Sequence, residues 1–406
     1  MKTRKIIHLD LDAFFCAVEE QLDPLLIGLP FAVGGRPDER GVVSSCSYAA
    51  RAHGVHSAMP MAQALRQCPQ LKIVSSHFLA YRQASRQVMA QLHKLTPLVE
   101  QLSIDEAFLD VSDLTEDAAA LGRNLQMEIW ETLGLPCSLG IASNKLVAKI
   151  ANDVGKGMAQ GGVPPRALTL VPAGSEAEFM APLPVKMLWG VGPKTAERLA
   201  PLGVQTIGDL AEMRAEELGQ VFGKIGWNLA KRARGIDTRP IVTEHEAKSV
   251  SQEVTYVKDT HDETVLRKTL REHSEHISRQ LKKQELTART VKIKLRWPDF
   301  STLTRQTTLT QPTTDAAEIH RAAEQLFNDL WSRGKDIRLL GVGVSNLEAQ
   351  PRQLGLWDPD VKKNLHLRET LNNLQERFGV ESIQRGIPTS DTNQRKNPTK
   401  PKHSDI

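Results

Sequence analysis

The sequence predicts a multidomain protein of the α+β class. The chain has 406 residues, enough for two to four domains at roughly 150 residues each. Strand-like and helix-like segments alternate through residues 5–165, which predicts helices layered on a sheet. A Gly-containing helical stretch over 184–235 and a second alternation over 248–347 indicate further domains.

Charge, cysteine spacing and hydropathy restrict the classes of protein to which the chain can belong. The formal net charge is +4, a mild basic excess that points weakly to nucleic acid. The cysteines are widely spaced without a CxxC pair, which excludes a zinc ribbon and favours a reducing compartment: Cys16, Cys46, Cys68 and Cys137. No apolar run approaches the length of a membrane span. We therefore expect a cytoplasmic protein without a membrane partner.

The first strand is expected over Lys5–Leu11, where apolar residues alternate, and it leads into a helix. Asp10 ends this strand, where a buried carboxylate needs a partner, so it is a candidate metal ligand. Asp12 is expected to cap the helix. Phe14 is expected to pack in the core, whereas Phe15 lies on a different face of the helix.

A β-branched strand passes into a helix over residues 41–51. Three polar side chains recur there at intervals of three, which predicts that they share a helical face: Ser45, Tyr48 and Arg51. A hydroxyl, a phenol and a guanidinium can together bind a polyphosphate. Ordinary surface positions for Tyr48 and Arg51 are an equal alternative at this point.

A hairpin is predicted where the apolar runs 98–104 and 107–111 flank Asp105 and Glu106. A two-residue turn would bring both carboxylates to its tip. No basic residue lies within six positions on either side to neutralise the two carboxylates. A divalent metal ion bound by their oxygens is therefore the simplest partner. Together with Asp10 they would form a three-carboxylate cluster, which suits two metal ions about 4 Å apart and phosphoryl transfer. A solvated turn is the alternative.

A helix predicted over 143–151 carries Lys145 and Lys149, whose like charges repel at this spacing, so nearby anions would stabilise it. Lys156 follows in a Gly-rich segment. It is placed either to reach a phosphate or to be solvated.

Four blocks in order resemble the Y-family DNA polymerases of the DinB (DNA polymerase IV) type: HLDLDAFF, SCSYAAR, SIDEAFLD and GIASNKLVAKIAND. The resemblance spans about residues 5–350. It implies a right-hand polymerase, with a palm of antiparallel-rich sheet (1–10 and 78–166) and small fingers (11–77).

The resemblance also implies the site. The metal ligands would be Asp10, Asp105, Glu106 and the Leu11 carbonyl, with two Mg²⁺ ions and Mn²⁺ as an alternative. Phe14 and Phe15 would line the nucleotide site, Phe15 being the steric gate against a 2′-hydroxyl. Triphosphate contacts would come from Ser45, Tyr48, Arg51 and Lys156. The chain departs from the family after Lys156, where the common Lys-Pro-x-Gly is replaced by Lys-Gly-Met-Ala.

Residues 167–234 contain a Gly-x-Gly-Pro-Lys-Thr run typical of a helix-hairpin-helix. Its glycines allow close approach, and the following helix presents free N–H groups to a DNA phosphate. The expected DNA contacts are Gly190, Gly192, Lys194 and Thr195. A tight corner between two helices is the alternative, and by resemblance this is the thumb.

After a linker (235–243), residues 244–350 resemble the α+β little finger. In the strand 290–297 apolar residues alternate with a basic stripe suited to a phosphate backbone: Lys292, Lys294 and Arg296. Residues 281–310 hold seven Lys/Arg against two Asp/Glu, so the charge bias is local. A solvated strand face is the alternative.

The C-terminal segment 351–358 resembles a sliding-clamp-binding peptide. Gln353 would form hydrogen bonds while Leu354, Leu356 and Trp357 fill an apolar pocket. A small docking helix is expected over 359–387, and disorder over the polar tail 388–406.

The sequence therefore predicts a monomeric DNA polymerase that binds primer-template DNA and a dNTP. Short fingers predict an open, low-fidelity site that performs translesion synthesis. All segments are assigned without an exonuclease domain, so proofreading is not expected. A DNA-binding accessory factor with a structural acidic cluster and a two-metal nuclease are the alternatives.

Overall fold

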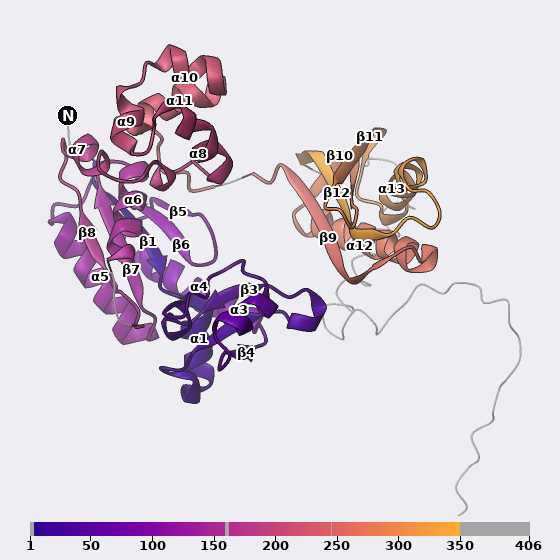
Figure 1. The fold of residues 1–406 in the computed structure, drawn as a ribbon, viewed down its shortest axis with the longest axis horizontal. Coiled ribbons are helices and arrows are strands. Elements are labelled where there is room, and N and C mark those ends of the chain that lie inside the picture. The colour runs from indigo at the N-terminus through magenta and orange to yellow at the C-terminus, as the bar shows by residue number, and fades with distance from the viewer. Residues whose placement is uncertain (1–3, 159–161, 245, 350–406) are drawn as a thin grey trace, which may run out of the picture. The chain divides into compact units, whose positions relative to one another are not determined.

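The computed structural model describes residues 4–158, 162–244 and 246–349. The clamp-binding peptide, docking helix and polar tail predicted beyond residue 350 lie outside the described residues. Mixed α+β architecture is confirmed, with three sheets and a helical segment (Figure 1). Within the described part of the chain, no helix has the length and apolarity needed to cross a membrane.

A five-stranded sheet carries the N-terminal strand at its centre. The strand order is β5-β6-β1-β7-β8, with β1 antiparallel to both neighbours and β8 parallel to β7. Its strands are β5 Val99–Gln101, β6 Glu106–Asp110, β1 Ile6–Leu11, β7 Cys137–Ala142 and β8 Leu168–Leu170. Because β8 belongs to this sheet, the sheet extends past the boundary predicted at residue 166.

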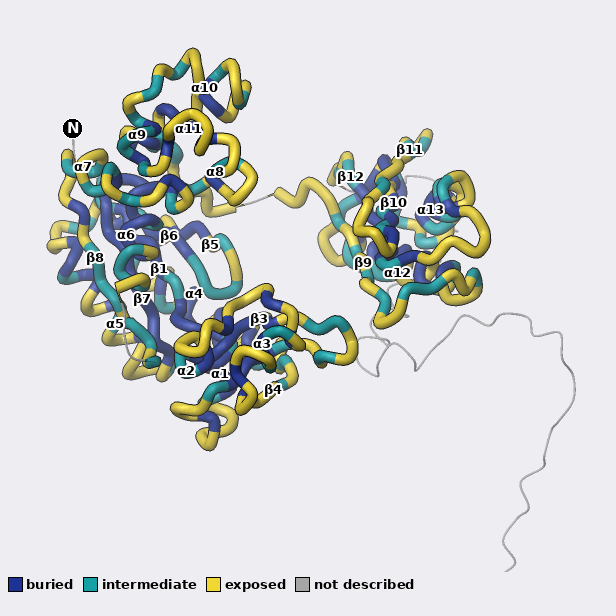
Figure 2. Tube along the Cα trace, viewed as in Figure 1, coloured by how far each residue is buried: buried dark blue, intermediate teal, exposed yellow. Residues whose placement is uncertain are grey.

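Helices cover both faces of this sheet, and the alternation in β1 explains why. Ile7, Leu9 and Leu11 enter a core with helices α4 (Phe78–Leu95) and α5 (Ala118–Leu133). Ile6 joins a second core with helix α6, which spans Lys145–Gly157. His8 and Asp10 share the face of Ile6, since alternate residues of a strand share a face. Polar side chains on the central strand are therefore held between sheet and helix, in a region that Figure 2 shows as largely buried.

Helix α6 (Lys145–Gly157) approaches β7 closely because Gly140 has no side chain. A Cβ at Gly140 would lie 1.9 Å from the Ala148 carbonyl oxygen and 2.5 Å from the Asn152 backbone nitrogen. We expect Gly140→Ala to destabilise the protein by about 1–3 kcal/mol, the usual range for overpacking. Chemical denaturation would measure it, with Gly157→Ala as control because nothing lies within 4 Å of that position. Equal stability of the two variants would contradict the expectation.

A three-stranded sheet, ordered β3-β2-β4, lies between β1 and α4 in the chain. Small apolar side chains and cysteines fill its core, including Ala32, Cys46, Met61 and Cys68. Its elements are α1 Phe14–Leu22, η1 Pro24–Leu26, β2 Phe31–Gly34, η2 Pro37–Glu39, β3 Val43–Cys46, α2 Tyr48–Arg51, α3 Met61–Gln67 and β4 Lys72–Val74.

A helical segment follows β8 and shares the second core with α6 and β1. Its apolar residues recur at helical spacing, and its turns fall at glycines. The elements are α7 Glu176–Met180, η3 Val185–Met187, α8 Pro193–Leu199, η4 Ala200–Leu202, α9 Ile207–Glu212, α10 Ala215–Phe222 and α11 Lys224–Ala233.

The last described segment forms a four-stranded sheet, ordered β11-β10-β12-β9, with two helices packed in its core. In β10 the predicted alternation is confirmed: Val291, Ile293 and Leu295 are buried, whereas Lys292 is exposed. The elements are β9 Ser249–Thr260, α12 Glu263–Lys283, β10 Leu286–Arg296, β11 Thr302–Thr313, α13 Ala316–Leu330 and β12 Ile337–Ala349.

Candidate active site

A cavity of about 450 Å³ lies where β1 ends and α1 begins. Most of the predicted metal and nucleotide ligands line it. They come from β1, α1, β3, α2, the β5–β6 loop and α6: Asp10, Leu11, Phe14, Phe15, Ser45, Arg51, Asp105 and Lys156. Glu106 and Tyr48 do not line it. Tyr48 instead borders a neighbouring cavity of about 160 Å³.

The β5–β6 connection is longer than the predicted two-residue turn. Residues 102–105 form the loop, and Glu106 is the first residue of β6. The backbone N–H groups of Leu102 and Ser103 both donate to the Glu106 carbonyl oxygen, which closes the loop. The prediction that both carboxylates sit at the tip is therefore wrong. Asp105 ends the loop, while Glu106 is held by strand pairing.

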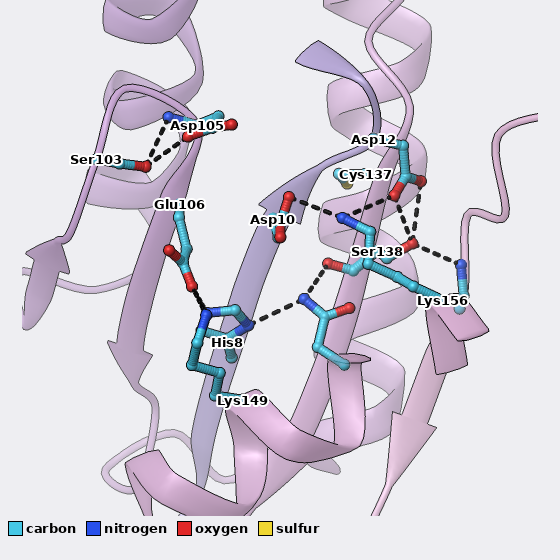
Figure 3. Close-up of polar contacts among 12 residues, drawn as sticks. His8, Asp10, Asp12, Ser103, Asp105, Glu106, Cys137, Ser138, Lys149 and Lys156 are labelled. Carbon is cyan, nitrogen blue, oxygen red and sulfur yellow. Dashed lines mark hydrogen bonds and ion pairs between the residues drawn. The ribbon is translucent and has the colours of Figure 1, made fainter. Parts of the chain in front are cut away.

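Strand pairing places Asp10 directly opposite Glu106. Paired residues of neighbouring strands point to the same face of a sheet, so these two carboxylates are neighbours, with Asp105 alongside on the loop (Figure 3). Asp105 receives a hydrogen bond from the Ser103 hydroxyl. Burial is the main cause that raises the pKa of Asp105, and the negative charges of Asp10 and Glu106 add to it. The hydrogen bond from Ser103 lowers the pKa but is outweighed. The three acids therefore interact electrostatically.

The side-chain arrangement is not a preformed metal cage. In the part of the chain that the structure describes, no three His, Cys, Asp or Glu side chains are grouped to hold a metal ion. The three carboxylates that sequence reasoning grouped are instead engaged with Ser103, His8 and two lysines. Their oxygens are the donors that Mg²⁺ and Mn²⁺ prefer, so the donor chemistry fits a divalent ion although side-chain rotation is needed.

Each lysine of α6 has a carboxylate partner, as the predicted repulsion between Lys145 and Lys149 required. Lys145 Nζ lies 2.6 Å from Glu100 Oε2 in a nearly buried pair. Lys149 pairs with Glu106. Burial alone would raise the pKa of Glu106, but hydrogen bonds from His8 and Lys149 lower it to about 2. Glu106 is therefore a carboxylate throughout the neutral range.

Lys156 contacts carboxylates in this structure. Its Nζ lies 2.8 Å from Asp10 Oδ1 and 3.2 Å from Asp12 Oδ1. Although burial opposes the charged form, these two acids raise the pKa of Lys156. The ammonium group thus sits at the cavity beside the strand-end acid, within the region where a bound anion would approach.

Asp12 is not the helix cap that the sequence predicted. Ala13, in the left-handed region at φ 46°, occupies the cap position without a side-chain bond. Asp12 is fully buried and accepts hydrogen bonds from the Ser138 hydroxyl, at 2.9 Å, and the Arg166 backbone N–H, at 3.1 Å. Burial raises the pKa of Asp12. Both of these partners are remote from Asp12 in the sequence.

Phe14 and Phe15 lie on different faces of α1, as the helix periodicity predicted. Phe14 is buried in the core, although its edge reaches the cavity. Phe15 is half-buried and stacks on Tyr81, with ring centroids 4.3 Å apart at 11°. The Tyr81 hydroxyl donates to buried Glu19, which also bonds His77. Neither Glu19 nor Tyr81 was among the site residues predicted from the sequence.

The prediction that Ser45, Tyr48 and Arg51 share one helical face is wrong for Ser45. Ser45 lies in β3, and α2 is a single turn that begins at Tyr48, capped by the Ser47 hydroxyl. The Arg51 guanidinium lies over the Tyr48 ring, 4.4 Å from its centroid. The Tyr48 hydroxyl is buried without a hydrogen-bond partner among the described residues, and burial raises its pKa to about 12. It is a neutral donor available to an anion.

The predicted DNA-contacting residues lie outside this cavity. Gly190 adopts φ 104°, and Gly192 precedes α8 with Pro193 in its first turn, which is the expected hairpin geometry. Lys194 is fully extended into solvent and pairs only with Glu197 at 3.3 Å among the described residues. Thr195 bonds back to Gly192 through its backbone N–H.

Two of the three basic side chains in the β10 stripe are bonded to side chains of other strands in the sheet. Lys294 Nζ donates to Glu253 at 2.8 Å, and Arg296 donates to the Thr302 hydroxyl at 2.9 Å. Lys292 is exposed.

The chain is similar to known proteins over most of its length. Family models match three parts of the chain: the impB/mucB/samB family (9–153), its C-terminal domain (247–356) and the thumb domain described as DNA polymerase-iota (186–237). The chain is 38% identical over 390 residues to the "DNA polymerase IV" of Dehalococcoides mccartyi strain CBDB1, covering 95% of this chain and 98% of that protein. It is 39% identical over 391 residues to that of Desulfatibacillum aliphaticivorans, covering 95% and 96%.

Solved structures agree with the family models. A Y-family DNA polymerase chimera of Dbh and Dpo4 matches with a TM-score of 0.74 at 26% identity, over 84% of this chain and 98% of that one. DinB from Sulfolobus solfataricus matches with a TM-score of 0.57 at 26% identity, over the same shares of the two chains. These matches confirm the right-hand polymerase fold expected from the sequence motifs. The chain belongs to the impB/mucB/samB family of Y-family DNA polymerases.

Proposed function

We propose that this chain extends a primer on template DNA at the cavity between β1, α1 and α6. The primer 3′-hydroxyl oxygen attacks the α-phosphorus of a dNTP, the bond to the bridging oxygen breaks, and pyrophosphate leaves. The observation that carries the proposal is the pairing of Asp10 with Glu106, beside Asp105, on a cavity that also presents Arg51 and Lys156. Carboxylates that can hold metal ions, together with cations that can bind phosphate, suit phosphoryl transfer. Family membership makes the enzyme a low-fidelity, translesion DNA polymerase.

Asp10, Asp105, Glu106 and the Leu11 carbonyl would hold two Mg²⁺ ions, or Mn²⁺ in their place. When bound, such ions lower the pKa of the attacking hydroxyl and neutralise charge on the leaving oxygen. The chain's own contribution is to hold these oxygens at the ends of paired strands. Lys149 and Lys156 balance the carboxylates' charge until a cation binds.

The nucleotide would lie between the acids and α2. Lys156 reaches Asp10 at 2.8 Å, so it has the length to contact a phosphate bound beside that carboxylate. Arg51, Tyr48 and Ser45 would contact the triphosphate from the opposite side. Phe15 would lie beneath the sugar, with Phe14 supporting it from the core.

The remaining parts would serve as palm, fingers, thumb and little finger, with the ranges expected from the sequence and the palm extended to β8. Gly190, Gly192, Lys194 and Thr195 would contact the DNA backbone from the thumb. Lys292, Lys294 and Arg296 would contact it from the little finger. The enzyme would act as a cytoplasmic monomer without proofreading, recruited to a sliding clamp through Gln353, Leu354, Leu356 and Trp357.

Metal removal tests the reaction. Chelation with EDTA is expected to abolish primer extension, because the facing carboxylates repel the triphosphate unless cations bind between them. Excess Mg²⁺ or Mn²⁺ should restore it. Primer extension assayed by denaturing gel electrophoresis would report the result, with duplex binding measured in parallel. DNA binding without extension at any concentration of either metal would favour the accessory-factor alternative.

A further inference from the structure

A buried histidine lies directly behind the metal-binding carboxylates. His8, in β1, is fully buried, and its Nε2 lies 2.6 Å from Glu106 Oε1 (Figure 3). On the other side of the ring, Nδ1 lies 2.9 Å from Asn152 Nδ2 in α6. The rings of His8 and Phe108 also pack against each other, with their centroids 4.7 Å apart. The imidazole is thus held from two sides with one nitrogen on Glu106.

The tautomer of His8 follows from its neighbours. The same Asn152 Nδ2 lies 3.1 Å from the Ser138 carbonyl oxygen, which can only accept a hydrogen bond. The amide therefore presents its NH₂ group, and one of those hydrogens points at His8 Nδ1. A nitrogen that accepts carries no proton, so the single proton of the neutral ring is on Nε2. His8 therefore donates its hydrogen bond to Glu106.

A second donor reaches the same oxygen. Lys149, one turn before Asn152 on α6, bonds Glu106 Oε1 as well. Among the described residues, no hydrogen bond to Glu106 Oε2 is found. One carboxylate oxygen is thus occupied by two protein donors, while the other is left for a ligand.

We propose that His8 and Asn152 form a positioning pair that holds Glu106 by Oε1 and presents Oε2 to the metal that activates the primer hydroxyl. This inference rests on the proposed function only in taking Glu106 as a metal ligand. Partners that orient a ligating group commonly change metal affinity 10- to 100-fold when removed. His8 acts through Glu106 and touches no substrate, so its effect should appear in metal affinity before it appears in DNA binding.

Three substitutions separate the donor from the bulk of the ring. His8→Gln places an amide donor near the position of Nε2, whereas His8→Asn places one near Nδ1. His8→Leu fills the space without a donor. Each is assembled with template, a primer that keeps its 3′-hydroxyl and a dNTP analogue whose α,β-imido bridge cannot be cleaved, and Mn²⁺ binding is measured by EPR titration. Primer extension against Mg²⁺ concentration is measured separately.

We expect Mn²⁺ to bind roughly 10- to 100-fold more weakly to His8→Leu and His8→Asn. His8→Gln should stay within about threefold of the parent, and the Mg²⁺ dependence of extension should shift in the same order. His273→Leu is the matched control, because this buried histidine of α12 has no partner for Nε2 among the described residues. Should His8→Leu fail to fold, the comparison of Asn with Gln stands alone.

Unchanged Mn²⁺ affinity in His8→Leu, or equal losses in His8→Asn and His8→Gln, would overturn the positioning role. A Glu106→Gln variant distinguishes this failure from a failure of the proposed function. If Glu106→Gln binds Mn²⁺ as tightly as the parent, Glu106 is not a ligand and the proposed site itself is wrong.

Discussion

Replacing Asp105 and Glu106 together by Asn and Gln is expected to reduce primer extension at least about 1000-fold, equivalent to about 4 kcal/mol of transition-state stabilisation. The substitutions keep side-chain shape but leave Asp10 as the only carboxylate of the three. A single carboxylate cannot hold two divalent ions between hydroxyl and triphosphate. Single-turnover extension, with primer-template affinity measured by fluorescence anisotropy, is the appropriate assay.

Folding should survive this double substitution. Burial already raises the pKa of Asp105, so the charged form is the costly one there and Asn relieves that cost. Lys149 loses its partner but remains partly exposed and can be hydrated. Glu128→Gln/Glu131→Gln removes the same charge from the exposed face of α5 and is the control. Extension within tenfold of the parent, with DNA binding intact, would refute the carboxylate mechanism.

Phe15→Ala is expected to raise incorporation of ribonucleotides relative to deoxyribonucleotides by roughly 10- to 200-fold, the range for a steric contact of this size. In the proposed nucleotide site, the Phe15 ring would be unable to move away from a 2′-hydroxyl. It stacks on Tyr81, and the Tyr81 hydroxyl is anchored to buried Glu19. Removing the ring opens space beside the sugar without touching the carboxylates.

Competition between an rNTP and the matching dNTP on one template would measure this ratio. The dNTP rate of the same variant serves as the internal reference for folding and metal binding. A parallel fall in both rates with an unchanged ratio would show that Phe15 supports the site's structure and does not discriminate the sugar.

Local sequence patterns were enough to predict several elements of the fold. Alternation along β10 correctly indicated which residues face a core, because the strand period depends only on backbone geometry. The glycines before α8 likewise indicated the turn of the helical hairpin. These predictions needed no knowledge of distant partners.

Predictions of side-chain partners were less successful, and the reason is their long range. His8 and Glu106 are 98 residues apart, Lys149 and Glu106 are 43 apart, and Asp12 bonds Arg166 across 154 residues. Nothing local to Asp12 distinguishes a helix cap from a buried acceptor. The length of the β5–β6 loop likewise depended on how Glu106 pairs with Asp10.

The sequence motifs were enough to predict the family and most of the acidic and basic residues around the cavity. How these side chains pair depended on the fold: Lys156 contacts Asp10 and Asp12, and Glu106 contacts Lys149 and His8. The physical reason is that a buried charge is stable only with a partner. Which partner it meets is set by strand register and helix packing, both of which bring together residues that are remote in the chain.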